Sequence, residues 1–592
     1  MTSSDTNLPV EAKPAAEAHM EHADDGNDIP SSDANAEATA DDDEPEEKFR
    51  LSLQHILAII SFQFGYMSDV FILTMSSSIL LQINEDIGPS TDYTWMANSM
   101  TLSAAVLSPF VGRLSDIFGR RNFLLFGNIL SVIGCVMSAT AKRVDIVIGG
   151  AVFIGAGSSM HQIAWSALSE MVPRKSRSVA LGFFMMSISA STAFGALIAY
   201  AMVQHTTWRD TYWFAFSLNA AASVLVFFFY KTSQKGIRDE GLTTWQSVKQ
   251  LDFIGFFLFL SGLVLFQLGI SFGGNKFPWK SAGTLAPMII GLVLLIALGV
   301  WEAYTTCPYP LFPRVVLKKV RGFTVVIAVV FLVGMVYYST AILWPQQVER
   351  LYTTDYVGIG LYSCTLSLSG AIFGPVSGYV FVKFKHARIL FTVLVTGVTI
   401  CSGAQAVVSP TSYVGSTILV AVIGALISSI TIISTTMAQL GVPHEYIGVA
   451  SGLAITSRSV GGTVATVVYT TVLQNDVSSR IGTVVGTALA KAGLPTDEIV
   501  NVLYALVEGD QSALASISPN ILAAGEYALK LTYAHAFKMV YLVSIAFGGV
   551  GMICAAFSMD VDHLLTSQVD VTMEHANAPK ESRTEDLEAE KV

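Results

Sequence analysis

Long apolar segments separated by short polar segments run along most of this chain. A helix that crosses a membrane needs about 20 predominantly apolar residues. Fourteen segments meet that requirement, and they predict an all-α polytopic membrane protein with transmembrane helices near 55–79, 95–114, 123–141, 146–170, 178–203, 212–230, 252–272, 284–304, 323–345, 357–381, 389–408, 414–440, 448–472 and 535–557. The tenth and twelfth segments are rich in Gly, Ser and Thr, which is typical of helices that pack closely through small residues.

The composition agrees with lipid as the solvent, because 52% of the 592 residues are hydrophobic and only 13% are charged. The net charge of -11 does not indicate a nucleic-acid partner or any other particular binding partner, because it lies mainly in one tail. Residues 1–50 hold 15 acidic and three basic residues, which leaves 30 acidic and 31 basic residues elsewhere. We predict disordered cytoplasmic tails at 1–50 and 561–592, since segments so poor in large apolar residues do not offset their ordering entropy.

The distribution of Lys and Arg predicts the orientation of the helices. With the N-terminus inside, the inward loops carry 17 basic residues and the outward loops carry nine. This bias favours both termini being cytoplasmic. The five cysteines are scattered singly, without a His/Cys cluster, so the sequence predicts no metal site, no disulfide framework and no cofactor.

A short pattern occurs twice, once after the fourth and once after the twelfth apolar segment. Val172–Gly182 and Val442–Gly452 both read VP-x6-A-x-G. Secondary transporters are commonly built from such repeats, with the substrate site between them at mid-membrane. The repeat predicts a six-helix half at 51–231, a linker with two inserted helices at 232–321, and a second six-helix half at 322–560 that includes a long outward loop at about 474–533.

The segment GRLSDIFGRRNFL (112–124) lies between the second and third helices. It resembles the cytoplasmic signature of the major facilitator superfamily, G-x-L-x-D-x-x-G-R-(R/K). The resemblance implies the major facilitator fold and a conformational latch formed by Gly112, Asp116, Gly119, Arg120 and Arg121. Glycines permit close approach and a tight turn, and a carboxylate can pair with arginines and cap helix ends. The alternative is a basic inward loop with ordinary helix caps.

Three further stretches, at 251–282, 342–355 and 533–549, are similar to a fungal group with fourteen spans. That group contains trichothecene-type efflux pumps and siderophore-iron transporters. Two positions depart from patterns of the wider superfamily. Ala151 stands where many proton-coupled relatives carry an Arg, and only Gly195 fits the antiporter pattern of the fifth helix. Both departures weaken the inference of antiport from resemblance alone.

Ionisable residues at membrane depth cost about 2.5–3.5 kcal/mol on insertion scales and are candidates for function. Asp69 lies in the first helix, after Gln63 and Tyr66 at helical spacing, and is a candidate for proton coupling or substrate binding. The alternative is a structural pair or a position near the outer interface. His161 and Gln162 occur within the fourth helix; His161 either relays protons or forms a hydrogen bond between helices.

Arg458 is the one Arg that lies deep within an apolar segment, in the thirteenth helix. It pairs with an acidic residue or an anionic substrate group, or its side chain extends toward the cytosol. Glu170 ends the fourth helix and is a candidate for gating. Aromatic walls of a central cavity are expected from Trp165, Trp344, Tyr337 and Tyr338, which otherwise belong to the core or the interfaces.

These observations predict a secondary active transporter in the plasma membrane rather than an enzyme, and no Walker-type phosphate loop is present. The first hypothesis is proton-coupled efflux of a small amphipathic compound such as a fungal toxin or drug. The second is proton-coupled uptake of ferric siderophores, and the third is a transporter-like nutrient sensor. The expected partners are a small organic substrate, protons and the lipid bilayer, with a monomer as the transport unit.

Overall fold

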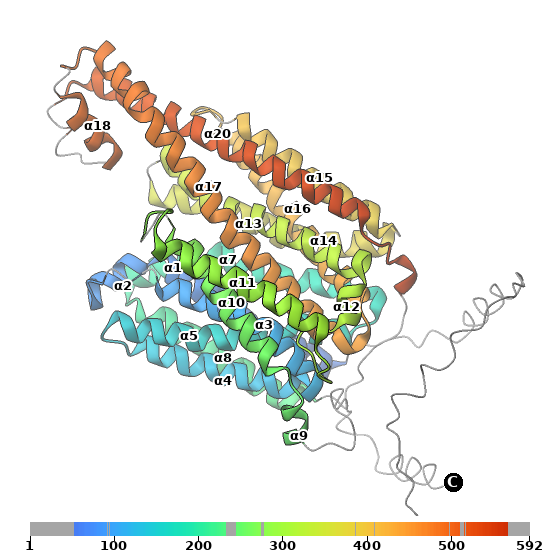
Figure 1. Ribbon diagram of the computed structural model, residues 1–592. Coiled ribbons are helices and arrows are strands. Elements are labelled where there is room, and N and C mark those ends of the chain that lie inside the picture. Colours follow the sequence, from blue (N-terminus) through green and yellow to red (C-terminus); the bar gives the residue numbers. More distant parts are fainter. Residues whose placement is uncertain are drawn as a thin grey trace, which may run out of the picture. The chain divides into compact units, whose positions relative to one another are not determined.

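Helices make up nearly all of the computed structural model (Figure 1), which describes residues 52–90, 93, 95–231, 244–273, 277–353, 355–384, 386–407, 409–495, 498–508, 514 and 517–565. The first half contains α1 (Leu53–Ser78), α2 (Leu80–Ile87), α3 (Trp95–Phe118), α4 (Arg120–Ala139), α5 (Val144–His161), α6 (Ile163–Met171), η1 (Arg174–Ser176), α7 (Arg177–His205) and α8 (Arg209–Phe229). The linker contains α9 (Thr244–Lys249), α10 (Phe253–Phe272), α11 (Ala282–Tyr304), α12 (Arg314–Lys318) and η2 (Val320–Thr324).

The second half contains α13 (Val325–Leu351), α14 (Tyr356–Phe384), α15 (Ala387–Ala404), η3 (Gln405–Val407), α16 (Tyr413–Leu440), η4 (His444–Tyr446), α17 (Ile447–Lys491), α18 (Ile499–Glu508), α20 (Pro519–Phe557) and η5 (Asp562–Leu564). We call the end of the bundle that carries Gly112–Arg121 the motif end, and the opposite end the distal end. The predicted tail at 1–50 and the part of the second tail beyond 565 lie outside the described residues.

A long helix, or a pair of consecutive helices, lies at each of the fourteen predicted positions, so the all-helical fold is confirmed. Twelve of these are long and apolar enough to cross a membrane, and α3 and α17 are not among them. The count of fourteen spans is therefore not confirmed. The fourth predicted helix is divided at Gln162, where α5 ends and α6 begins.

The lower hydropathy of α3 and α17 has a structural reason, because the two helices pack on one another. A Cβ atom at Gly112 would lie 2.6 Å from the carbonyl oxygen of Gly448, and one at Gly452 would lie 2.8 Å from that of Ser108. The hydroxyl of Thr456 donates to the carbonyl of Ala105 at 3.0 Å. Small and polar residues are typical of closely packed helices in membranes, where they need not face lipid.

The helices α7 and α14 form the corresponding contact between the two halves. A Cβ atom at Gly182 would lie 2.7 Å from the carbonyl oxygen of Gly374 and 2.9 Å from the Cα of Pro375. A Cβ atom at Gly452 would lie 3.0 Å from the Cα of Pro109 in α3. The last glycine of each copy of VP-x6-A-x-G thus packs against a proline inside a helix of the other half, which explains why the pattern occurs twice.

The inserted helices α10 and α11 pack on each other, and α10 packs against both α3 and α17. Phe110 of α3 stacks on Phe256 of α10 with 3.9 Å between ring centroids. Near the distal end, the rings of Trp95 and Phe272 lie edge to face at 6.2 Å. An apolar cluster that includes Val106 and Phe259 also takes in Leu453 of α17. The insertion therefore covers the line along which α3 meets α17.

The segment predicted as a long outward loop at 474–533 is largely helical. The helix α17 continues to Lys491 and α20 begins at Pro519, with α18 between them (Figure 1). Val485, Leu489 and Ala528 belong to a buried apolar cluster of this extension. At its base, Asp476 accepts hydrogen bonds from His535 at 2.8 Å and from Arg480 at 3.2 Å.

The boundary of the second predicted tail needs a correction. Residues 561–565 are ordered: Val561 is fully buried in the main core cluster of the second half. The Asp562 carboxylate accepts a hydrogen bond of 3.1 Å from the backbone N–H of Ala387, at the start of α15. A prediction from composition misses this turn, because Val561 and Asp562 alone do not change the average composition of the segment.

The glycine contacts predict a stability effect. We expect Gly182→Leu to lower the free energy of unfolding by about 1–3 kcal/mol, because the side chain overpacks the contact with Gly374 and Pro375. Thermal unfolding in detergent measures the loss. Gly299→Leu is the matched control, since a Cβ atom at Gly299 in α11 meets nothing within 4 Å. Equal effects of the two substitutions would contradict this account of the contact.

Candidate functional site

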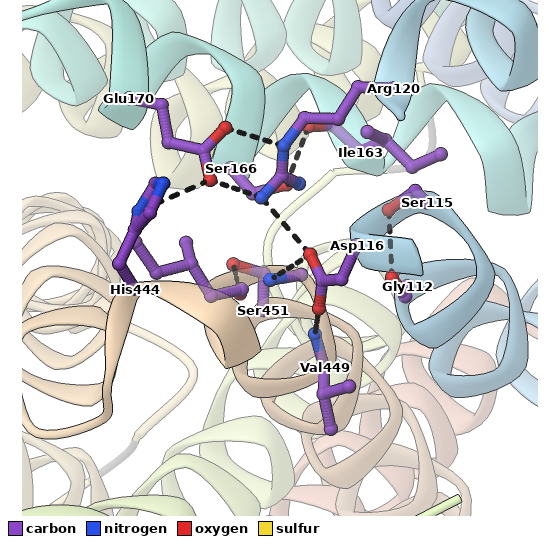
Figure 2. Close-up of polar contacts among 12 residues, drawn as sticks. Gly112, Ser115, Asp116, Arg120, Ile163, Ser166, Glu170, His444, Val449 and Ser451 are labelled. Carbon is purple, nitrogen blue, oxygen red and sulfur yellow. Dashed lines mark hydrogen bonds and ion pairs between the residues drawn. The ribbon is translucent and has the colours of Figure 1, made fainter. Parts of the chain in front are cut away.

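The carboxylate of Asp116 joins the two halves at the motif end (Figure 2). It accepts hydrogen bonds from the backbone N–H groups of Gly448 and Val449, both at 3.0 Å. These are among the first amides of α17, which have no partner within their own helix. A carboxylate is favoured there by hydrogen bonding and by the helix dipole. A Cβ atom at Gly448 would lie 2.3 Å from Oδ1 of Asp116, so glycine is needed for this approach.

Arg120 links Asp116 to Glu170 (Figure 2). One terminal nitrogen, Nη2, donates to Asp116 at 3.1 Å and also bonds Glu170, while Nε donates to Glu170 at 2.6 Å. The other terminal nitrogen bonds the hydroxyl of Ser166 in α6. All three charged groups are buried. The geometry thus gathers Asp116, Arg120 and the predicted gating residue Glu170 into one network, with two carboxylates around one guanidinium.

The two remaining predicted latch residues have different places. Gly119 has φ 88° and ψ 150°, a conformation that is almost restricted to glycine, and it reverses the chain between α3 and α4. Arg121 lies apart from Asp116: its Nη2 donates to the carbonyl of Phe227 at the end of α8 at 2.7 Å. The structure therefore separates Arg121 from the latch, because successive helical residues face different sides.

Other residues of the latch were not predicted. The carboxylate of Glu170 lies 3.9 Å from Nδ1 of His444, in the turn before α17. Arg113, only 5% exposed, has its guanidinium 5.1 Å from the ring of Tyr446 in the same turn and 5.9 Å from that of Tyr309 in the linker. His444 and Tyr446 lie within the second VP-x6-A-x-G pattern. The repeat of this pattern is the sequence feature from which a contact of this turn with the other half could have been predicted.

A second polar contact lies deeper in the first half. His161 at the end of α5 places Nδ1 2.8 Å from Oδ2 of Asp69 in α1, and the two side chains are 2% and 4% exposed. We call this pair the Asp69–His161 dyad. On the other side of the ring, Nε2 has no hydrogen-bond partner among the described residues, and His161 lines a small pocket with Asn128 and Ser61. Asp69 and His161 were separate candidates in the sequence analysis, and the structure shows that their side chains are in contact.

Gln162 takes a different direction from its neighbour. Its side-chain oxygen accepts a hydrogen bond from the hydroxyl of Ser108 in α3, at the point where α5 gives way to α6. This contact ties the break in the helix to α3, which in turn packs on the second half. Gln162 therefore does not join the dyad.

Aromatic side chains surround the inner face of the first half. Tyr66, Trp165 and Phe184 lie edge to face with one another, with ring centroids between 5.2 and 6.3 Å apart. From the second half, the guanidinium of Arg458 lies 4.6 Å from the ring centroid of Tyr337. The predicted wall residues Trp165 and Trp344 do not line a cavity, because both are buried, and Trp344 donates to the carbonyl of Tyr362 at 2.9 Å.

In the part of the chain that the structure describes, one group of three side chains has the spacing of metal ligands. His386, Asp560 and Asp562 lie at the motif end with ligand atoms within 4.8 Å of one another. The Asp562 carboxylate is already used at the start of α15, and His386 and Asp560 are exposed. A structural cap with a weak surface ion pair accounts for the group without a metal.

The latch predicts that the charge of Asp116 is required and that of Arg121 is not. We expect Asp116→Asn to lower transport roughly tenfold, since weakening a charged hydrogen bond costs about 1.5–3 kcal/mol and about 1.4 kcal/mol is a factor of ten. The variant should remain folded, because Glu170 still pairs with Arg120. Transport by purified protein in vesicles measures the effect, with Arg121→Gln as control. Normal transport by Asp116→Asn would remove the latch.

Comparisons with known proteins agree with this architecture. Residues 19–591 match the family described as "Fungal trichothecene efflux pump (TRI12)". The MFS-type transporter prx5 of Penicillium rubens is 28% identical over 89% of this chain and 94% of its own length. The trichothecene efflux pump TRI12 of Fusarium sporotrichioides is 23% identical over 90% of this chain and 91% of its own.

Among solved structures, the human organic anion transporter MFSD10 (TETRAN) matches with a TM-score of 0.48 at 12% identity, covering 84% of this chain and 100% of that one. The comparisons favour efflux over siderophore uptake, and transport over enzymatic activity. From the match over nearly its whole length, the chain belongs to the fungal trichothecene efflux pump family of major facilitator transporters.

Proposed function

We propose that this protein exports a small amphipathic organic compound in exchange for protons. The observation that carries the proposal is the buried Asp69–His161 dyad, with 2.8 Å between Nδ1 and Oδ2. A carboxylate and an imidazole in contact share their protons, and imidazole titrates near physiological pH. The dyad thus takes up or releases one proton with a small change in structure. Its place inside the first half keeps the proton apart from the substrate between the halves.

The latch supports alternating access as the transport mechanism. Closure of the motif end joins Asp116 to the start of α17, and the closely packed glycines place the halves in direct contact. Opening that end breaks the bonds of Asp116 to Gly448 and Val449, while the Arg120–Glu170 pair remains within the first half. Secondary transporters commonly work by rocking one half against the other around a central site.

The substrate candidates are fungal toxins and drugs. Two relatives are named trichothecene efflux pumps, which makes trichothecenes the first compounds to test. The rings of Tyr66, Tyr337 and Tyr338, which are only half-buried, suit an apolar ring system. We further propose the plasma membrane as the location, with both termini in the cytosol and a monomer as the transport unit. The excess of basic residues in loops at the motif end supports this orientation.

If the dyad couples transport to protons, its substitution should remove the dependence of transport on the pH gradient. In sealed vesicles, a pH gradient should drive efflux of a labelled trichothecene or drug by the wild-type protein. We expect Asp69→Asn to abolish the effect of the gradient, because an amide does not exchange protons at these pH values. His161→Gln should lower it, since the remaining carboxylate lacks its partner. Asp476→Asn is the control, a carboxylate bonded to a histidine in the helical extension.

The same proteins can be tested in yeast that lacks its own siderophore carriers. Reduced retention of labelled toxin without accumulation of siderophore-bound iron-55 is the expected outcome. Iron accumulation that a protonophore abolishes would overturn the assignment of efflux. An unchanged response to pH in Asp69→Asn would retire the dyad as the coupling site while leaving export intact.

A further inference from the structure

Arg458 lies deep in the bundle, and no residue that the structure describes forms an ion pair with it. It is the twelfth residue of α17, about 16 Å from the start of that helix at the motif end. A cation at membrane depth costs about 2.5–3.5 kcal/mol on insertion scales and normally pairs with an anion. The side chain is half-buried, and its Nε atom is buried.

Three buried carboxylates of the first half are already paired with other residues. Asp69 contacts His161, while Asp116 and Glu170 share Arg120. Among the described residues, none forms an ion pair with Arg458, and its Nε is buried without a hydrogen-bond partner. The contact that remains is the ring of Tyr337 at 4.6 Å, and a cation–π contact contributes about 0.5–2 kcal/mol. The positive charge is therefore only partly compensated by the protein.

The neighbours of Arg458 place it where the two halves meet. Ile455, one turn earlier on the same face of α17, packs against the cluster that contains Trp165 and Phe184 of the first half. Tyr66, which is only half-buried, belongs to the same aromatic group. This region thus offers one partly accessible aromatic ring from the first half and one incompletely paired guanidinium from the second.

We propose that this region binds an amphipathic substrate with an acidic group, and that the anion of that group pairs with Arg458. The inference rests on the transport function proposed above and names its substrate class. A guanidinium presents a fork of N–H donors that matches a carboxylate, while the aromatic side chains take the apolar ring system. A neutral toxin would leave the cation of Arg458 uncompensated.

An anionic substrate changes the net charge that crosses the membrane in each transport cycle. Export of a monoanion in exchange for one proton moves two positive charges inward in each cycle. An inside-negative membrane potential would then drive export in addition to the pH gradient. Exchange of a neutral compound for one proton would move only one charge.

The test compares an acid with its ester. Pyrenebutyrate and its methyl ester share the ring system and differ in charge, and both are fluorescent. Binding to the purified full-length protein is measured by thermal stabilisation, and export by vesicles with an imposed pH gradient. The variants are Arg458→Gln, which removes the charge, and Arg458→Lys, which keeps it. Arg480→Gln is the control, an exposed arginine of the helical extension.

We expect the wild-type protein to bind pyrenebutyrate at least roughly tenfold more tightly than the ester, which is the scale of a charged hydrogen bond. Arg458→Gln should remove this preference, Arg458→Lys should keep part of it, and Arg480→Gln should keep all of it. The melting temperature of unliganded Arg458→Gln should not fall, because the variant loses a poorly compensated charge. A clear fall would assign Arg458 a structural role instead.

Equal binding of acid and ester by the wild-type protein would overturn the proposal, as would an unchanged preference in Arg458→Gln. Preferential binding of the acid without its export under a pH gradient or a membrane potential would support the binding site and reject the proposed transport function. Export of a neutral trichothecene at the same rate by wild type and Arg458→Gln would retain the transport function and reject the acidic substrate class.

Discussion

The amide groups at the start of a helix need acceptors, and at the start of α17 two of them find Asp116 of the other half. Much of the motif end depends on this contact. Glycine at 112 and 448 lets the backbones approach, and glycine at 119 turns the chain so that Arg120 meets the same carboxylate. Arg120 in turn holds Glu170, which ends α6. A single carboxylate thus links the ends of α3, α4, α6 and α17. Loss of its bonds to α17 would leave the contacts within each half in place.

The insertion adds to this contact between the halves. It meets α3 from Trp95 and Phe272 near the distal end to Tyr309 beside Arg113 at the motif end. Its helix α10 also contacts α17, through apolar side chains such as Leu453. The insertion therefore touches a helix of each half, and the ring of Tyr309 joins that of Tyr446 beside the buried cation of Arg113.

Helices and their approximate ends could be predicted from the sequence, because apolar segments of sufficient length have few alternatives in lipid. The residues Asp69, His161 and Arg458 could be found because ionisable groups are rare in such segments, and Asp116 could be found from its place in the superfamily signature. Their partners could not. Contact between Asp69 and His161 depends on how α1 and α5 are rotated against each other, and helical spacing within one segment says nothing about that rotation.

Hydropathy and composition also failed to predict the packing of α3 and α17 and the helical structure between α17 and α20. The helices α3 and α17 are the more polar ones because they face protein, and a hydropathy window takes every residue to face lipid. The segment between α17 and α20 contains the helix α18 and its own apolar cluster, although its length suggested an irregular connection. Arg121 follows Arg120 in the motif but reaches α8, since neighbours on a helix point about 100° apart.

The continuous helix of α17 has a mechanical meaning. From residue 472, where the last predicted span before the extension ends, to Lys491 it runs about 28 Å further without a break. The contact of Asp476 with His535 fastens it to α20 at the base. A stiff rod of this length acts as a lever arm on the second half: a rotation of a few degrees at the level of Arg458 becomes a displacement of several ångströms at its tip. Movement of the second half is thus amplified at the tip of the extension, where a pair of fluorescent labels would report it.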